Sequence, residues 1–168
     1  MPLSIAIPHE RRPDERRVAL VPQLADRLVQ HGARVRVEAG AARRAGFHDS
    51  AWDLPGVQVV DDFAATVNGA DLVIKVAPPT LDEVRLLPTG CTLVSLVSAF
   101  QHLDVVEALR ARAITTLAMD LVPRRTRARS MNAVASQGTV AGYKAALLAA
   151  ELSPRLFPML TTAAGTVR

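Results

Sequence analysis

The sequence predicts an α/β protein: a single Rossmann-like domain with a mostly parallel sheet, helices on both faces and a long helix near the C-terminus. Three observations lead to this fold class. Short apolar runs alternate with helical patterns along the chain. The apolar runs lack the every-second-residue pattern of a half-exposed strand, which is typical of parallel strands buried on both faces. A length of 168 residues is enough for one domain with its own core.

Six apolar runs are predicted to be strands, which would make a complete doubly wound layer. They cover residues 3–8, 34–38, 57–60, 71–76, 92–97 and 114–119. Helices are expected over residues 21–31, 63–67, 80–87 and 103–113, with a weaker helical stretch near residue 51. Asp61 or Asp62 can cap the second of these helices and Thr80 the third, because their side chains accept hydrogen bonds from the first free backbone amides.

The longest helical pattern follows the last strand and an arginine-rich loop. Ser130 is the natural N-cap, and the helix is expected to cover residues 131–151. The apolar face of this pattern is built largely from small residues, including Gly138, Ala141, Gly142 and Ala145. Small side chains leave room for another backbone, so this face predicts tight packing against another element. Self-association of two chains, giving a homodimer, is one way to cover it.

Composition excludes several classes of protein. With 49% hydrophobic and 21% charged residues, the chain is not of the disordered type. Its net charge of +4 is modest, so no nucleic-acid partner is expected. The single Cys91 lies in an apolar run, where a buried, inert thiol and a reducing, cytoplasmic setting are expected. No apolar run approaches the ~18 residues of a membrane span, and the first residues do not begin a signal peptide, so no direct membrane insertion is expected.

Common catalytic signatures are missing from the sequence. It contains no GxGxxG, Walker loop, HExxH or GxSxG motif. Its four histidines have no ligand spacing, so no metal site is expected. Lys75, one of only two lysines, interrupts an apolar run. At the carboxyl end of a parallel strand it either points into the ligand-binding crevice of α/β folds or extends its ammonium group to the surface.

Arginine residues are the other candidates. Arg17 is either a solvated charge or a ligand contact. The loop that precedes the long helix holds Arg124, Arg125, Arg127 and Arg129. These side chains could bind a phosphate or carboxylate in bidentate fashion, remain solvated, or contact nucleic acid. No aromatic residue is interleaved to stack on bases, which disfavours the last alternative.

Several motifs in one order resemble the alanine dehydrogenase and proton-translocating NAD(P) transhydrogenase family, over essentially the whole chain. The first half contributes Ile5-Ala6-Ile7-Pro8-His9-Glu10-Arg11, Glu15, Arg17-Val18-Ala19, Pro22, Val37-Glu38-Ala39-Gly40-Ala41 and Lys75-Val76. The second half contributes Thr92-Leu93-Val94-Ser95, Ala118-Met119-Asp120, Pro123-Arg124, Ser130-Met131, Ala141-Gly142-Tyr143, Phe157-Pro158-Met159 and Ala163-Ala164-Gly165-Thr166. The second set makes the resemblance strongest to the transhydrogenase alpha-subunit branch.

The resemblance implies a domain organisation. Residues 1–130 are similar to the first α/β domain of the family, 131–152 to a helix that bridges to an NAD-binding domain, and 153–168 to a truncated linker. NAD(H) is implied as the cofactor only together with a second domain that carries the glycine fingerprint, and no cofactor is expected for the chain alone. The remaining transhydrogenase domains or subunits are the implied partners, and they would place the chain in the cytoplasm, peripheral to the inner membrane.

The resemblance also implies site residues. The family's nicotinamide loop carries Arg, Gln, Asp and Ser at positions that match Arg124, Arg129, Asn132 and Ala135, so three of the four are altered here. Tyr143 belongs to the same cofactor-binding region. In the alanine dehydrogenase branch, Arg17 and Lys75 match the positions that hold the substrate carboxylate and carbonyl. The histidine that this branch carries is expected near Ser98 and is absent, which favours the transhydrogenase branch.

Three functional hypotheses follow from these residues. The chain is the N-terminal domain of a transhydrogenase alpha subunit that helps to position NAD(H) for hydride transfer coupled to proton translocation. Alternatively, it is a non-catalytic, degenerate paralogue that acts as an interaction or regulatory protein. A lesser alternative is a fragment similar to alanine dehydrogenase.

Overall fold

The computed structural model describes residues 2–123, 126–155, 157, 159–163 and 165–167. The chain forms two compact units, Met1–Val122 and Pro123–Arg168. This division falls slightly before the expected boundary at residue 130.

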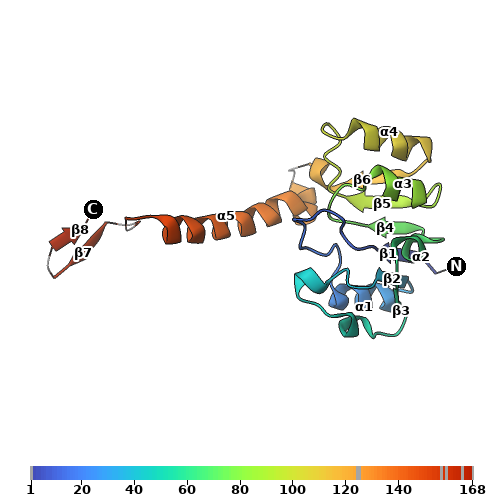
Figure 1. Ribbon diagram of the computed structural model, residues 1–168, viewed down its shortest axis with the longest axis horizontal. Coiled ribbons are helices and arrows are strands. Elements are labelled where there is room, and N and C mark those ends of the chain that lie inside the picture. The colour runs from blue at the N-terminus through green and yellow to red at the C-terminus, as the bar shows by residue number, and fades with distance from the viewer. Residues whose placement is uncertain (1, 124–125, 156, 158, 164, 168) are drawn as a thin grey trace. The chain divides into compact units, whose positions relative to one another are not determined.

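The first unit is built on a six-stranded sheet (Figure 1). Its strands are β1 (Ser4–Ile7), β2 (Arg34–Glu38), β3 (Val57–Val60), β4 (Leu72–Ile74), β5 (Thr92–Ser95) and β6 (Thr115–Ala118). Their order is β3-β2-β1-β4-β5-β6, and every neighbouring pair is parallel. The predicted parallel α/β fold with six strands is therefore confirmed.

Four helices accompany this sheet: α1 (Pro22–Gln30), α2 (Phe63–Val67), α3 (Leu81–Leu86) and α4 (Leu103–Ala111). Local sequence explains where they begin. Pro22 occupies the first turn of α1, where its missing amide costs nothing. The Asp62 side chain accepts from the Ala65 amide and caps α2, and Thr80 caps α3. Short 3-10 helices cover Arg43–Ala45, Asp49–Trp52 and Met119–Leu121, and the second replaces the weak helix expected near residue 51.

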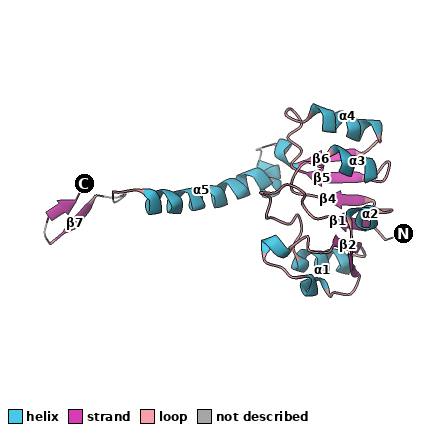
Figure 2. Ribbon diagram, in the orientation of Figure 1, coloured by secondary structure: helices cyan, strands magenta, loops and turns pink. Residues whose placement is uncertain are grey.

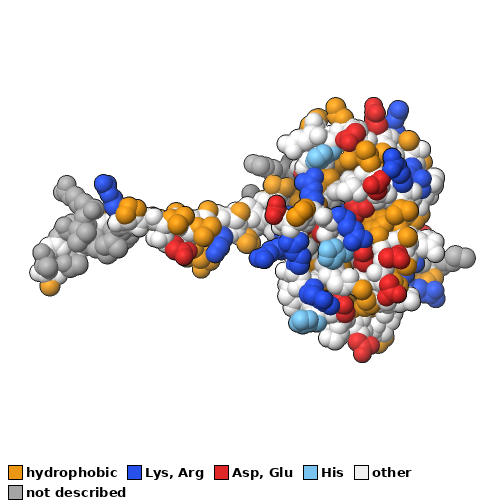
Figure 3. Space-filling model, in the orientation of Figure 1, with side chains coloured by type: hydrophobic (Ala, Val, Ile, Leu, Met, Phe, Trp, Pro, Cys, Tyr) orange, Lys and Arg blue, Asp and Glu red, His pale blue; other side chains and the backbone are white. Residues whose placement is uncertain are grey.

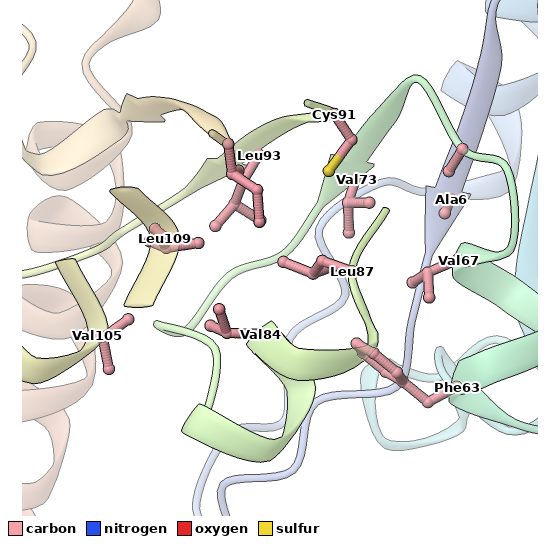
Figure 4. Close-up of a cluster of buried hydrophobic side chains, with 12 residues drawn as sticks. Ala6, Phe63, Val67, Val73, Val84, Leu87, Cys91, Leu93, Val105 and Leu109 are labelled. Carbon is pink, nitrogen blue, oxygen red and sulfur yellow. The ribbon is translucent and has the colours of Figure 1, made fainter. Parts of the chain in front are cut away.

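The sheet carries a hydrophobic core on each face, because successive side chains of a strand point to opposite sides. Ile5 and Ile7 of β1 belong to one cluster, together with Trp52, whereas Ala6 belongs to the other. The cluster that contains Ala6 joins the sheet to α3 and α4. Figure 4 shows Leu87 at its centre, with side chains from the sheet and the helices around it.

The second unit contains a 3-10 turn over Thr126–Met131, the helix α5 (Ala133–Leu152) and a hairpin of β7 (Leu160–Thr162) and β8 (Gly165–Val167), as Figure 2 shows. The predicted long helix is present, but the prediction of Ser130 as its N-cap is wrong. The 3-10 turn includes Ser130, and Asn132 caps the helix instead: its Oδ1 accepts from the Ala135 amide at 2.9 Å. No described residue of α5 is buried, and the segment expected to be a linker contains the hairpin.

Candidate functional site

The strand order places a topological switch point between β1 and β4. From these two central strands the chain proceeds toward opposite edges of the sheet. Open α/β folds commonly bind ligands at the carboxyl ends of the strands at such a switch point. Glu10 follows β1 and Lys75 follows β4 directly, so both reach this end of the sheet. A buried charge cluster results.

Lys75 is fully paired within this cluster. Its side chain is 1% exposed, and its Nζ lies 2.5 Å from Glu83 Oε1 and 3.9 Å from Glu10 Oε2. The Phe63 ring also lies beneath it, 5.8 Å from Nζ to the ring centroid. The alternative in which Lys75 extends its ammonium group to the surface is therefore wrong, because that group is buried. It lies at the strand end but is neutralised by protein carboxylates.

Glu10 fastens the end of β1 to the end of β4. Its two carboxylate oxygens accept from the backbone amides of Val76 at 2.6 Å and Ala77 at 3.2 Å. Burial raises the pKa of Glu10 above its ordinary value, and the nearby charge of Lys75 and the two amide hydrogen bonds oppose this effect. Burial is the main cause of the raised pKa of Glu10, and the negative charge of Glu83 adds a smaller rise in the same direction.

Glu83 is positioned by a motif that is visible in the sequence. Thr80 and Glu83 form a capping box at the start of α3: Thr80 Oγ1 accepts from the Glu83 amide, and Glu83 Oε2 accepts from the Thr80 amide at 2.8 Å. The other oxygen of the same carboxylate then pairs with Lys75. A local helix cap therefore fixes a charge that the buried lysine requires.

Arg17 lies in the loop between β1 and α1. Its guanidinium contacts both carboxylate oxygens of Glu15, at 2.8 and 2.6 Å. This pairing lowers the pKa of Glu15 and raises the pKa of Arg17, which the charge of Glu10 raises further. Glu10 is thus near both candidate substrate-contacting residues, since its carboxylate lies 3.9 Å from the Lys75 ammonium group and its charge contributes to the raised pKa of Arg17.

Asp120 shapes the carboxyl end of β5. Its carboxylate accepts from the amides of Val97 at 2.8 Å and Ser98 at 3.1 Å. Ser98 adopts a positive φ of 50°, which is uncommon for a residue other than glycine. This position offers a hydroxyl group and no imidazole. The Nε2 of the nearest histidine in sequence, His102, accepts from the Arg12 guanidinium at 3.2 Å.

The positions that match the nicotinamide loop belong to the second unit. Arg124 lies outside the described residues, as does the side chain of Arg129. Asn132 and Ala135 meet through the helix cap described above. Tyr143 lies two turns further along α5 and is 71% exposed.

Sequence reasoning missed three residues of this site: Glu10, Glu83 and Asp120. The Thr80-x-x-Glu83 spacing signals a capping box, but nothing local shows that its carboxylate also meets a lysine. Asp120 follows the last strand, where acidic residues commonly bind ligands or backbone amides. Glu10 offers no signal of its own, because its partners lie more than sixty positions away in the chain.

The described residues contain no cluster of histidine, cysteine or acidic side chains suited to a metal ion. On the face of the first unit shown in Figure 3, acidic and basic side chains lie next to one another. Within the described part of the chain, none of the helices combines the length and the apolar character needed to cross a membrane.

Comparison with known proteins decides the family. The model of the family described as "Alanine dehydrogenase/PNT, N-terminal domain" matches residues 6–141. The chain belongs to this family.

Within it, transhydrogenase alpha subunits resemble the chain over more of its length than alanine dehydrogenases do. The chain is 43% identical to the first of the polypeptides that make up the NAD(P) transhydrogenase alpha subunit of Rhodospirillum rubrum, over 98% of this chain and 44% of that protein. The crystal structure of transhydrogenase from Sinorhizobium meliloti matches with a TM-score of 0.88 and 35% identity, over 98% of this chain and 49% of that one. A solved L-alanine dehydrogenase matches with a TM-score of 0.69 and 28% identity, over 74% of this chain and 35% of that one.

The chain spans less than half the length of the Rhodospirillum rubrum polypeptide. It corresponds to the N-terminal part of the transhydrogenase alpha subunit.

Proposed function

We propose that the chain serves as the N-terminal domain of an NAD(P) transhydrogenase alpha subunit and helps to position NAD(H) for hydride transfer to NADP. The proposal includes partners that supply the NAD-binding domain and the remaining subunits, and a location in the cytoplasm, peripheral to the inner membrane through those subunits. One observation carries it: the transhydrogenase structure is matched over 98% of the chain, which includes the segment after residue 122, whereas the alanine dehydrogenase structure is matched over 74%.

The site supports this branch over an amino-acid dehydrogenase. Ser98 stands where the alanine dehydrogenase branch carries a histidine, and the hydroxyl of serine has no pKa suited to general acid or base chemistry near neutral pH. The Asp120 carboxylate accepts from the backbone amides of Val97 and Ser98, and these contacts need no imidazole at position 98. Arg17 is paired with Glu15, and Lys75 is paired with Glu83 at the switch point.

The test uses a fusion protein. The chain is followed by the segment of the Rhodospirillum rubrum polypeptide that the match does not cover, so that the two parts stand in the same order as in that relative. This fusion is assayed for NADH binding and, with an NADP-binding component from an intact relative, for hydride transfer between the two nucleotides. We expect NADH binding and no oxidation of L-alanine by NAD. Alanine oxidation would favour the dehydrogenase branch, and an absence of NADH binding by a folded fusion would contradict the proposal.

The second candidate, a degenerate paralogue, rests on the altered positions Arg129, Asn132 and Ala135. It shares NADH binding by the fusion with the first proposal and differs in hydride transfer. Hydride transfer by the unreverted fusion at the rate of an intact relative would favour the first proposal. Transfer that rises only after reversion of the three positions would favour the second.

A further inference from the structure

Strand β2 carries two arginines on one face, although it lies between β1 and β3 in the sheet. Val35 and Val37 are buried and belong to the cluster on the α1 face. Arg34 and Arg36 alternate with them, so their side chains lie on the opposite face. Parallel strands that are covered on both faces are apolar on both faces. The face of β2 that carries the two arginines is therefore only partly covered.

The short helix α2 provides the cover that this face has. It contains only five residues and packs on β1 and β2. The Arg36 guanidinium donates to the carbonyl oxygens of Ala65, at 3.1 Å, and Asn68, at the C-terminal end of α2. Arg36 is therefore held in place by the helix. Arg34 is exposed, and in the described part of the chain its side chain has no hydrogen bond or ion pair.

The surface beside these arginines forms an open cavity of about 440 Å³. Strand register brings polar side chains to it from both neighbouring strands. Ser4 of β1 pairs with Arg34, and Gln58 of β3 pairs with Arg36, so the four side chains share one face. All four line the cavity, and among the described residues no carboxylate belongs to its lining. The cavity has the size of a site for a small molecule.

The lining offers hydrogen-bond donors and positive charge. Arg36 uses three of its five N–H donors on Ala65, Asn68 and the Ser4 hydroxyl, and the other two are not used in these bonds. The Ser4 hydroxyl accepts from Arg36 at 3.3 Å and keeps its own hydrogen for donation. Gln58 adds a carboxamide N–H group. One carboxylate is close by: Asp71 accepts from the Ser4 backbone amide at 2.8 Å.

We propose that this cavity binds a phosphate dianion, either as the free ion or as the terminal group of a phosphate monoester. Two guanidinium groups balance two negative charges and form strong, charge-assisted hydrogen bonds to phosphate oxygens. Donors that come from three strands suit a tetrahedral group better than a planar carboxylate. Each phosphate within NADH is a diester with a single charge, so NADH is not the ligand of this cavity.

The inference does not depend on the proposed function. All the residues of the cavity belong to the first unit, and they lie toward the amino ends of their strands. Glu10 and Lys75 lie at the other end of the sheet, where β1 and β4 finish. Phosphate binding is therefore a property of the chain by itself, and it can be measured without any partner.

An NMR titration of the complete, ¹⁵N-labelled chain tests the proposal. The titration is performed at pH 8, where phosphate groups carry two charges, in a buffer without phosphate or sulfate. Inorganic phosphate and phenyl phosphate are the two probes, and succinate is a dicarboxylate control with the same charge. We expect saturable shifts of the backbone amides of Ser4, Arg36 and Gln58 with phosphate, and binding at least about tenfold weaker with succinate. Tighter binding of phenyl phosphate than of inorganic phosphate would identify the ligand as an ester, and the reverse would identify it as the free ion.

Arg34→Gln is the decisive variant, because this side chain has no structural contact to lose among the described residues. Loss of its charge-assisted hydrogen bonds should weaken phosphate binding at least about tenfold. Arg27→Gln is the matched control: it removes the same charge from an exposed position of α1, which packs on the other face of the sheet. We expect this control to change the affinity by less than about twofold, because a distant surface charge is screened by salt.

Three outcomes would overturn the proposal. If neither phosphate probe produces a saturable shift of the cavity amides, the cavity does not bind phosphate. If the two variants weaken binding equally, phosphate is attracted by the net charge of the protein and not by this cavity. If succinate binds as tightly as phosphate, the cavity does not select a tetrahedral dianion. NADH binding by the fusion is unaffected by any of these results, so failure of this inference leaves the proposed function standing.

Discussion

At the scale of single residues, the switch point depends on a balance of charge. Glu10 and Glu83 share one lysine, and the buried site tolerates them because Glu10 also accepts two backbone amides. Replacement of Lys75 would leave Glu83 and Glu10 buried without their positive partner, which costs about 3–5 kcal/mol. The network therefore holds the ends of β1 and β4 together while it remains complete.

We predict that Glu10 makes stability fall as pH rises from about 4.5. Its pKa in the folded protein is raised above the ordinary value of 4.5 by burial, so the unfolded chain loses the proton first as pH increases. The unfolded state is then favoured until the folded pKa is passed, and the effect is constant above it. Urea unfolding across this range should show a smaller fall with pH in Glu10→Gln than in the unchanged protein.

Glu15→Gln is the matched control, because the pKa of Glu15 is lowered by Arg17. The stability that Glu15 contributes is present above about 4.5 and is lost as pH falls through its folded pKa. The two substitutions should therefore change the slope of stability against pH in opposite directions. If both substitutions changed the slope of stability against pH in the same direction, the assignment for Glu10 would be refuted.

The three altered loop positions give a second prediction at this scale. In the fusion, the triple change Arg129→Gln, Asn132→Asp and Ala135→Ser should raise hydride transfer by at least ~100-fold, with a smaller effect on NADH affinity. Misplacement of a reacting group by ~1 Å costs about this much in rate, and an added guanidinium repels the positive charge of oxidised nicotinamide. Single-turnover kinetics measures the effect. Transfer at the rate of an intact relative without the reversion would show that these positions are dispensable.

At the scale of elements, α5 depends on its first turn. A helix with no buried residue has little tertiary packing to stabilise it, so its caps carry more weight. Asn132 supplies the cap through the Ala135 amide, and Ser136 adds a hydrogen bond from its hydroxyl to the Asn132 carbonyl. Asn132, which the family resemblance implies as a nicotinamide-loop position, is thus also the N-cap of α5.

Asn132→Ala should weaken α5 by about 1 kcal/mol, the usual cost of a lost N-cap, whereas Asn132→Asp should retain the cap. A carboxylate at this position also interacts favourably with the positive end of the helix dipole. Circular dichroism at increasing temperature should show earlier loss of helical signal in the alanine variant. Equal helicity in the two variants would mean that the cap contributes nothing measurable.

At the scale of the whole molecule, the architecture of the first unit affects nucleotide binding. A dinucleotide fold binds pyrophosphate at a tight, glycine-rich turn from its first strand into its first helix. Here residues 8–21 separate β1 from α1, and the N-cap residue Val21 makes no side-chain cap. The acidic residue that follows β1 and the one that ends β2 are engaged internally. Glu10 accepts from the amides of Val76 and Ala77, and Glu38 pairs with Arg11 and accepts from the His9 amide.

We therefore predict that the chain alone binds NADH no more tightly than about millimolar, which corresponds to roughly −4 kcal/mol. Isothermal titration calorimetry of the chain and of the fusion, side by side, measures the difference. Micromolar binding by the chain alone would show that this unit holds a nucleotide site of its own.

The sequence by itself determined the sheet, four of its helices and the family, because apolar runs, caps such as Thr80 and ordered motifs are local signals. Tertiary structure decided what a local pattern does not encode. It showed that the ammonium group of Lys75 is buried between two carboxylates and that Asn132 and not Ser130 begins α5. The reason is physical: the charges that stabilise Lys75 come from Glu83, eight residues away in a helix cap, and from Glu10, which follows a strand far away in sequence. The cavity beside β2 likewise depends on strand order and register, which act only once the sheet has formed.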